Sequence, residues 1–270
     1  MLGVSCEFSR VAYAPAVAFT ATTAAELVAI GFGVGAFGTL IGAGGGFILT
    51  PILLLLYPHD SPRTITAISL AVVFFNAASG SAAYARQGRI DYRNGTVFAL
   101  ATLPGAIGGA LLVGDVSRRL FSTIMGAVLA ALAVWLLIGE RWPLPVPQNR
   151  MRVGAAYSLA VGFLSSFLGI GGGVIHVPLL VRALGFPTHV ATATSHFVLA
   201  IMAGAGSLTH VALGSFKHGH GVHRTIALAV GVVGGAQLGA HVSLRLRGAV
   251  IQWLLALALL ALAARLLMSA

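Results

Sequence analysis

The sequence predicts an all-α integral membrane protein built from two inverted repeats of five apolar segments each. Three observations support this fold class. Of the 270 residues, 58% are hydrophobic and only 8% are charged, whereas a soluble domain carries about 25% charged residues. The apolar runs are longer than the strands of a membrane barrel and do not alternate, which favours helices. A glycine-rich motif at residues 42–51 returns at residues 169–178, which indicates an internal duplication.

The net charge is +10, from 16 Lys and Arg against 6 Asp and Glu. The basic residues lie in short loops between apolar runs, so membrane topology and anionic lipids account for most of them. We therefore expect the lipid bilayer as a partner and no nucleic acid. The single cysteine, Cys6, excludes a disulfide framework and a multi-cysteine metal site, and no cofactor is expected. Residues 1–23 lack the basic start and clean apolar segment of a cleaved signal peptide.

The first repeat, residues 24–138, opens with an apolar run at 24–41, close to the ~20 residues that cross a bilayer. The glycine motif interrupts this run, and a much shorter apolar stretch follows at residues 47–57. At ~1.5 Å per residue this stretch covers about 16 Å, roughly half of the hydrocarbon core. We therefore expect a broken or re-entrant helix there. Full spans are expected at residues 64–85, 96–113 and 121–138.

A proline-rich linker at residues 139–152 leads into the second repeat, residues 153–270. The glycine motifs are 127 positions apart, and Ser69 recurs 126 positions later as Ser195. An odd number of crossings per repeat inverts the second repeat relative to the first, whether the short segments cross or turn back. The apolar segments of the second repeat follow the order of the first, at residues 153–168, 174–184, 190–213, 225–242 and 250–268.

The same parity places both termini on one side of the membrane. Cytoplasmic loops are richer in Lys and Arg than external ones, and the larger basic set lies on the side opposite the termini. We therefore expect the termini to lie outside. The larger set consists of Arg86, Arg89, Arg93, Arg141, Arg150, Arg152, Arg182, Arg245 and Arg247. The smaller set consists of Arg10, Arg63, Arg118, Arg119, Lys217 and Arg224.

The glycine triplets are the first candidate for a binding site. Non-helical backbone at membrane depth survives only in a protein-lined or watery cavity, and glycine can adopt φ > 0 and let a ligand approach the main chain. Each motif directly precedes a short helix, whose N-terminus offers free N–H groups and partial positive charge. Two such ends converging at the midplane would hold an anion, although small residues also serve as packing points between helices. The candidates are Gly44, Gly45, Gly46, Gly171, Gly172 and Gly173.

Polar side chains within the spans are few, so each is a candidate for function. Ser69 and the run Thr194, Ser195 and His196 would add hydrogen-bond donors for an anion. His196 could also carry a proton, or it could simply bond a neighbouring helix. Four further polar residues could likewise either bind the anion or bond a neighbouring helix, and for His176 the packing role is favoured. These four are Asn76, His176, His210 and Gln237.

Metal and enzyme chemistry have little support in the sequence. The run His218, His220 and His223 has no acidic or cysteine partner nearby, so a solvated loop is favoured over a metal site. No Ser-His-Asp set, P-loop lysine or pair of carboxylates is visible. We therefore expect neither a metal nor an enzymatic activity.

At these residues the chain resembles the TauE/SafE family of sulfite-exporter-like permeases, over about residues 27–264. The resemblance rests on G-x-G-G-G-x-x-x-x-P in both halves, on the span starts 67–69 and 193–195, and on the exit Gly88-Arg89-Ile90-Asp91. It implies a bacterial inner-membrane permease for sulfur-containing anions, such as sulfite, thiosulfate, sulfoacetate or related sulfonates. The second exit, residues 214–217, has Lys217 where the first has Asp91.

Together these features predict a secondary transporter for a small sulfur oxyanion or organosulfonate that works by alternating access. An anion channel that uses the same constriction is the first alternative. The second alternative is a membrane subunit without a transport function, or a membrane-embedded enzyme.

Overall fold

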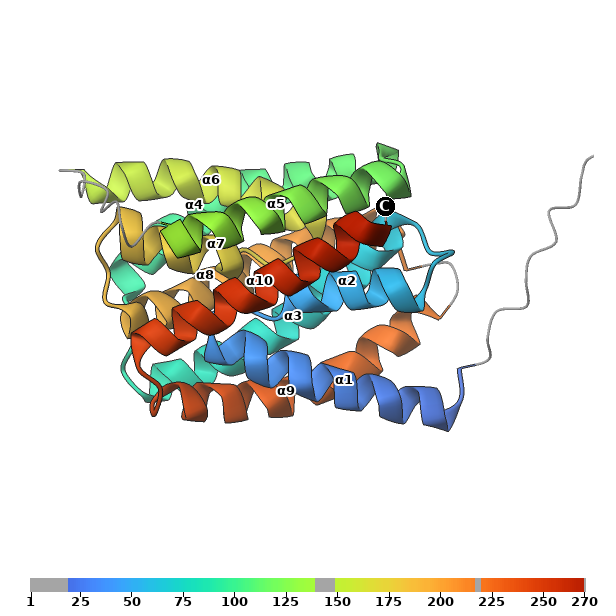
Figure 1. The fold of residues 1–270 in the computed structure, drawn as a ribbon, viewed down its shortest axis with the longest axis horizontal. Coiled ribbons are helices and arrows are strands. Elements are labelled where there is room, and N and C mark those ends of the chain that lie inside the picture. Colours follow the sequence, from blue (N-terminus) through green and yellow to red (C-terminus); the bar gives the residue numbers. More distant parts are fainter. Residues whose placement is uncertain (1–18, 139–148, 217–219, 270) are drawn as a thin grey trace, which may run out of the picture.

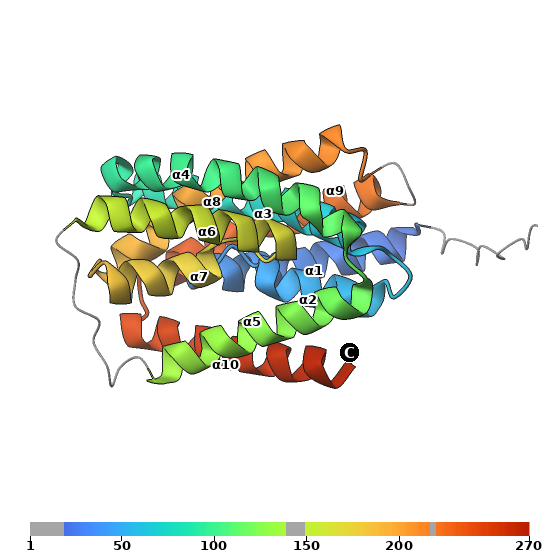
Figure 2. The same cartoon turned by 90° about the horizontal axis from the view of Figure 1, so that it is seen from above.

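The computed structural model describes residues 19–138, 149–216 and 220–269, and this part of the chain forms helices and contains no β-strand. Eight of the helices are long and apolar enough to span a membrane. Figures 1 and 2 show them bundled along the long axis of the molecule. The predicted all-helical membrane fold is therefore confirmed. Most of the N-terminal segment and of the linker, including Arg10 and Arg141, lies outside the described residues.

The eight long helices match the eight predicted full spans. All eight begin a few residues before the expected start, because capping residues and the polar first turn carry no hydropathy signal. Ser61 accepts a bond from the Thr64 N–H at the start of one helix, and Asp91 accepts one from Asn94 at the next. The helices are α1 (Ala21–Leu40), α3 (Pro62–Arg86), α4 (Tyr92–Leu112), α5 (Arg118–Ile138), α6 (Arg150–Leu168), α8 (Thr188–Ala212), α9 (Gly221–Ser243) and α10 (Gly248–Ser269).

The two short segments follow the glycine motifs but differ from each other. The first is the α-helix α2 (Gly46–Leu56). The second is α7 (Gly173–Pro178), which continues as the π-helical turn η2 (Leu179–Ala183) instead of the uniform helix expected at 174–184. Pro178 removes one backbone donor where the π turn begins, but Pro51 has the same place in α2 without this effect. The proline alone therefore does not account for the wider turn.

The long helices pair across the linker. Helix α1 packs along α9, α4 along α6, α3 against α8, and α5 against α10. Figures 1 and 2 show α1 beside α9 on one side of the bundle, α4 beside α6 on another, and α10 crossing with α5 over a third. Glycines allow the closest approaches: a β-carbon at Gly235 would meet the Phe32 carbonyl, and one at Gly109 would meet the Phe163 carbonyl. Small residues commonly serve this purpose in membrane helices.

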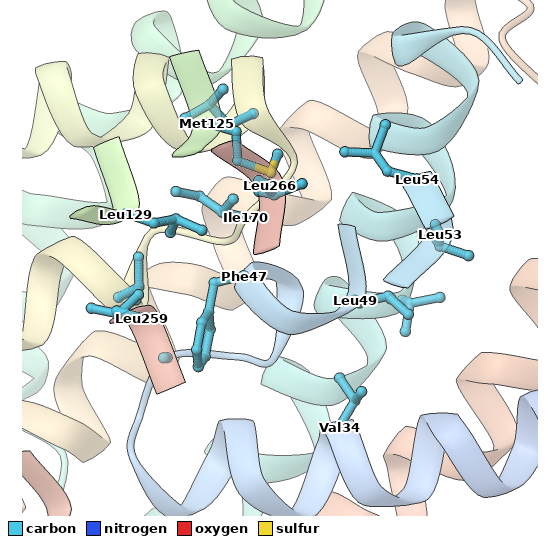
Figure 3. Packing of buried hydrophobic residues seen from close by; sticks show 14 of the residues in the cluster. Val34, Phe47, Leu49, Leu53, Leu54, Met125, Leu129, Ile170, Leu259 and Leu266 are labelled. Atoms are coloured by element: carbon cyan, nitrogen blue, oxygen red, sulfur yellow. The ribbon is translucent and has the colours of Figure 1, made fainter. Parts of the chain in front are cut away.

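The centre of the molecule contains α3 and α8, the most buried of the eight long helices. Helix α2 lies between them and the α5–α10 pair. Figure 3 shows its Phe47 packed with Ile170, Leu129 of α5 and Leu259 of α10. On the outside, large apolar side chains remain uncovered: Leu100 and Leu208 are 60% and 71% exposed. Lipid tails are the solvent that such a surface fits.

Candidate functional site

The two glycine motifs meet in the interior of the molecule. Residues 41–47 and 168–174 are all buried. A β-carbon added at Gly46 would lie 2.6 Å from the backbone of Ile170, and one added at Gly173 would lie 2.6 Å from Cα of Ala43. The turn between α1 and α2 therefore touches the turn between α6 and α7, backbone against backbone. We name these the first turn, residues 41–45, and the second turn, residues 169–172.

The glycines of the triplets are required for two different reasons, a positive φ at some positions and the close approach of the opposite turn at others. Gly44, Gly45 and Gly171 have φ values of 75°, 77° and 72°, which side chains rarely adopt. Gly46 and Gly173 do not have positive φ, but the close approach of the opposite turn excludes a side chain there. Gly172 has φ −62°, whereas its counterpart Gly45 has φ 77°, so the two turns are not copies of each other in detail.

Several main-chain donors at the turns have no partner. In the first turn, the N–H groups of Ala43 and Gly44 both donate to the Gly38 carbonyl. The N–H groups at the start of α2 and α7 receive no side-chain cap, and within the described residues no hydrogen bond is formed by those of Gly45, Gly46, Gly172 and Gly173. Buried unpaired N–H groups are rare and costly. They are donors available to a buried anion.

Each turn is bonded by one serine from a helix in the other half of the chain. Ser69 of α3 donates to the Gly169 carbonyl over 2.7 Å, and Thr50 lies 2.7 Å from the same oxygen. Ser195 of α8 donates to the Gly42 carbonyl over 3.4 Å. Both candidate serines thus lie at the turns, but their hydroxyl hydrogens bond the main chain in this structure. They position the turns.

A buried polar cluster lies beside the first turn. Nε2 of His196 is 3.2 Å from the Thr39 hydroxyl, which is also 3.2 Å from Oδ1 of Asn76. The Tyr84 hydroxyl donates to the Thr39 carbonyl over 2.6 Å, and the His196 ring lies next to the backbone of Gly42. Nδ1 of His196 and Nδ2 of Asn76 have no partner. Sequence reasoning missed Thr39 and Tyr84; their signal is a polar side chain inside an apolar span.

His176 lies on the other side of the turns. Its Nε2 is 3.1 Å from the Ser158 hydroxyl, and its Nδ1 has no partner. It borders a void that is too tight for a water molecule and is lined by Thr102, Val161, Gly172, His176, Ser195, Val198, Leu199 and Met202. Side chains of Val73 and Leu199 lie against Gly171. The contact between the turns is therefore closed by apolar side chains.

Three predicted site residues lie away from the turns. Thr194 accepts a bond from the Asp91 N–H over 3.0 Å, at the end of the bundle where α4 starts. His210 bonds Ser215 over 3.1 Å near the end of α8. Gln237 is exposed and donates to the Ser79 carbonyl over 2.8 Å. The structure thus brings together the glycines, Ser69, Ser195, His196, Asn76 and His176, and leaves out Thr194, His210 and Gln237.

Polar contacts also join helices at both ends of the bundle. At the end that holds the start of α1, Arg224 pairs with Asp60 over 2.7 Å and stacks on Tyr57, while Arg118 donates to the Leu54 and Asp60 carbonyls. We name Asp60 and Arg224 the outer latch; the name assumes the orientation predicted above. Burial raises the pKa of Tyr57, so its ring stays neutral.

At the opposite end, Arg89 donates to Ser243 over 3.1 Å and lies 3.0 Å from Nδ1 of His189. We name these three residues the inner latch. Burial lowers the pKa of Arg89, but a guanidinium stays charged throughout the physiological range. The latch therefore holds a permanent positive charge against α8 and α9.

No group of three His, Cys, Asp or Glu residues in the described ranges could hold a metal ion. His218 lies outside those ranges. His220 and His223 pack with each other and with Phe19, with ring centroids 5.5–6.1 Å apart. These contacts lie at the start of α9, at one end of the bundle.

Comparison with known proteins gives the family. Residues 27–266 match the model of the family described as "Sulfite exporter TauE/SafE". The chain is 28% identical to the "Probable membrane transporter protein YunE" of Bacillus subtilis (strain 168), covering 82% of this chain and 89% of that protein. It is also 28% identical to a "Probable membrane transporter protein" of Xylella fastidiosa (strain Temecula1), over 80% and 82% of the two chains. No solved structure matches it. The chain therefore belongs to the sulfite exporter TauE/SafE family and is a multi-pass membrane transporter, not an enzyme.

Proposed function

We propose that this protein is a secondary transporter that moves a small sulfur-containing anion, such as sulfite, thiosulfate or an organosulfonate, by alternating access. One observation carries the proposal: two backbone turns touch in the buried interior of the helix bundle and leave the N–H groups of two helix starts unbonded. Sulfur oxyanions offer several acceptor oxygens that such donors can bind, and helix starts favour negative charge. The description of the matching family names sulfite export, which supports this class of substrate.

We further propose that residues 24–138 and 153–270 are inverted repeats, joined by the linker 139–152 and preceded in the sequence by the N-terminal segment 1–23. The helix contacts support this. In the two repeats, α1 corresponds to α6, α3 to α8 and α4 to α9. Exchanging the repeats therefore turns the α1–α9 pair into the α6–α4 pair and leaves α3 packed against α8. The crossed serine bonds, from Ser69 to the second turn and from Ser195 to the first, exchange in the same way.

In this proposal the anion binds between the first and second turns. The unbonded N–H groups of Gly45, Gly46, Gly172 and Gly173 bind its oxygens, and His196 and Asn76 add donors from the first-turn side. The turns are in contact and leave no room for the anion, so we assign the structure to an occluded state. Binding requires Val73 and Leu199 to move, and each half-cycle requires one latch to open.

We place the protein in a bacterial inner membrane with the inner latch toward the cytoplasm. The end that holds Arg89 also holds Arg86, Arg93 and the start of α6, and cytoplasmic ends are richer in basic residues. The outer latch then faces the outside together with the start of α1.

Counterflow in liposomes tests the proposed function. Purified protein is reconstituted, loaded with one unlabelled sulfur anion, and supplied with labelled sulfite, thiosulfate, sulfoacetate or methanesulfonate outside. We expect saturable exchange for at least one anion. Gly45→Val should abolish it, because the added side chain meets the Val34 carbonyl at a φ of 77°. Gly33→Val is the matched control, since nothing lies within 4 Å of a β-carbon there.

Two results would count against the proposal. Single-channel currents that rise linearly with voltage would indicate a pore. Folded protein that exchanges none of the anions, or a Gly45→Val protein that folds and transports at the original rate, would remove the assigned site.

A further inference from the structure

Carboxylates are missing from the depth of the turns. The four acidic residues in the described ranges lie in loops or near helix ends: Glu26, Asp60, Asp91 and Asp115. Asp60 is paired with Arg224, and Asp91 caps α4. A transporter that uses a proton gradient needs a titratable group within the membrane. In this chain the group next to the turns with that chemistry is an imidazole.

His196 occupies a place that the fold makes for it. Gly80 on α3 has no side chain, and a β-carbon there would lie 2.7 Å from Nε2 of the ring. The ring is fully buried, and Tyr84 meets it edge to face with centroids 5.6 Å apart. These contacts fix its orientation beside the first turn. They leave Nδ1 without a partner in a site with no exposure to solvent.

The hydrogen bonds around the ring assign its neutral tautomer. The Thr39 hydroxyl has one hydrogen and donates it to Oδ1 of Asn76. With the Asn76 amide oriented so that Oδ1 faces Thr39, the hydroxyl can only accept from His196, and this orientation assigns the hydrogen to Nε2 and the lone pair to Nδ1. That lone pair is the place where a proton can be added without breaking a bond of the cluster.

We propose that His196 carries the proton that is transported with the anion, an inference that rests on the proposed function. When the site is open to one side, a proton from water adds to Nδ1 and the ring becomes an imidazolium with two N–H donors. A buried unpaired charge is costly, and an anion at the first turn offsets it. Proton and anion therefore each raise the affinity for the other by the same factor. On the opposite side both leave, and the neutral ring returns.

The charged groups around His196 cannot neutralise a proton on its ring, so this role is left to the bound anion. From α3, Tyr84 faces the ring, and the Arg89 guanidinium lies beyond it, 4.9 Å from the Tyr84 ring centre. On α4 the nearest acid, Asp91, is used at the helix start. His176 of α7 is bonded to Ser158 across the turns, Arg182 of η2 donates to the Trp135 carbonyl, and Arg152 is exposed at the start of α6. Among the described residues, the elements packed around His196 thus supply positive charge and no free carboxylate.

In the part of the chain that the structure describes, the polar cluster of Thr39, Asn76 and His196 occurs once. At the equivalent positions of the other half, offset by 126 or 127, His196 corresponds to Leu70, Asn76 to Met202 and Thr39 to Ser166. The space next to Gly206 accordingly holds Ser166 and Leu70 in place of a second imidazole. A single site of this kind gives one proton per transported anion.

Proton flux measured together with anion flux tests the inference. Liposomes containing the protein and a pH-sensitive dye are given thiosulfate or methanesulfonate, neither of which titrates near neutral pH, whichever of the two shows counterflow. The wild type should acidify the lumen in proportion to anion uptake, and an inward acid gradient should drive accumulation. In His196→Gln, a side chain that bonds but does not titrate, the ratio of protons to anions should fall to zero. In the control His210→Gln, at a buried histidine that lies away from the turns, the ratio should be unchanged.

A measurement on the unaltered protein keeps the inference testable if His196→Gln does not fold. Calorimetric titration with the same anion in two buffers of different ionisation enthalpy should show uptake of one proton per anion. Affinity should weaken by up to about tenfold per pH unit as the pH rises, because binding is linked to one proton. Binding without proton uptake, or a His196→Gln protein that still couples protons to anions, would overturn the assignment. Absence of counterflow with every anion would overturn the proposed function itself.

Discussion

The contact between the two glycine turns can be tested by placing a methyl group on each side of it. In Gly46→Ala the new β-carbon would lie 2.6 Å from the Ile170 backbone and 2.7 Å from Val73. Ordinary contacts begin near 3.4 Å, so the turns must separate by about 0.8 Å. Forcing a methyl group into a packed interior costs roughly 1–3 kcal/mol. Gly173→Ala presses on the same interface from the other side, against Ala43, and should cost a similar amount.

The double variant, with both Gly46→Ala and Gly173→Ala, tests whether the two positions share one contact. Once one methyl group has separated the turns, the second finds part of its space already made. The loss in unfolding free energy should therefore be smaller than the sum of the single losses by about 1 kcal/mol, as expected for residues that share a contact. Gly33→Ala, with nothing within 4 Å, should be neutral or stabilise by up to ~1 kcal/mol through helix propensity.

Equilibrium unfolding of purified protein in mixed micelles, followed by circular dichroism, measures all four variants. Strict additivity within about 0.5 kcal/mol would mean that the two positions do not share an interface. A Gly46→Ala protein as stable as Gly33→Ala would equally refute the backbone contact on which the candidate site depends.

Two further predictions concern the contacts that hold the turns and the outer latch. Ser69→Ala should lower the unfolding free energy by about 1 kcal/mol, because it removes a 2.7 Å bond to the Gly169 carbonyl. Ser195→Ala, which removes a 3.4 Å contact, should cost less, and the reverse order in denaturant titrations would contradict the geometry. Asp60→Asn and Arg224→Gln should each cost up to about 1 kcal/mol at low salt, and the double variant no more than either, because both break one ion pair. Melting curves that show summed losses would mean that the two side chains act independently.

The sequence was a good guide to features that the bilayer itself imposes. A spanning helix needs an unbroken apolar run, so all eight long helices could be located, and the glycine motifs correctly indicated breaks that precede short helices. The meeting of the breaks followed from the duplication. The sequence alone did not indicate the π turn after Pro178, because the same proline leaves α2 regular.

Side-chain partners were harder to predict, because they depend on which helices pair. Ser69 and Ser195 were expected to face a ligand, yet each bonds the main chain of the opposite turn. Gln237 is polar within a span but lies on the outside, where it bonds the α3 backbone. Thr39 and Tyr84 belong to the polar cluster only because α8 brings His196 into contact with both of them. Hydropathy reports depth in the membrane and does not report neighbours.

The pairing of α1 with α9 has a consequence for synthesis on the ribosome. About 180 residues separate the end of α1 from the start of α9, and at ~5–20 residues per second the nascent chain needs roughly 10–40 s to supply the missing partner. Throughout that interval the glycine-lined groove of α1 around Gly31 and Gly35, which α9 later fills, is covered by lipid or by the insertion machinery. Biogenesis of this protein thus includes a waiting period, and neither half is a unit that can complete its own assembly.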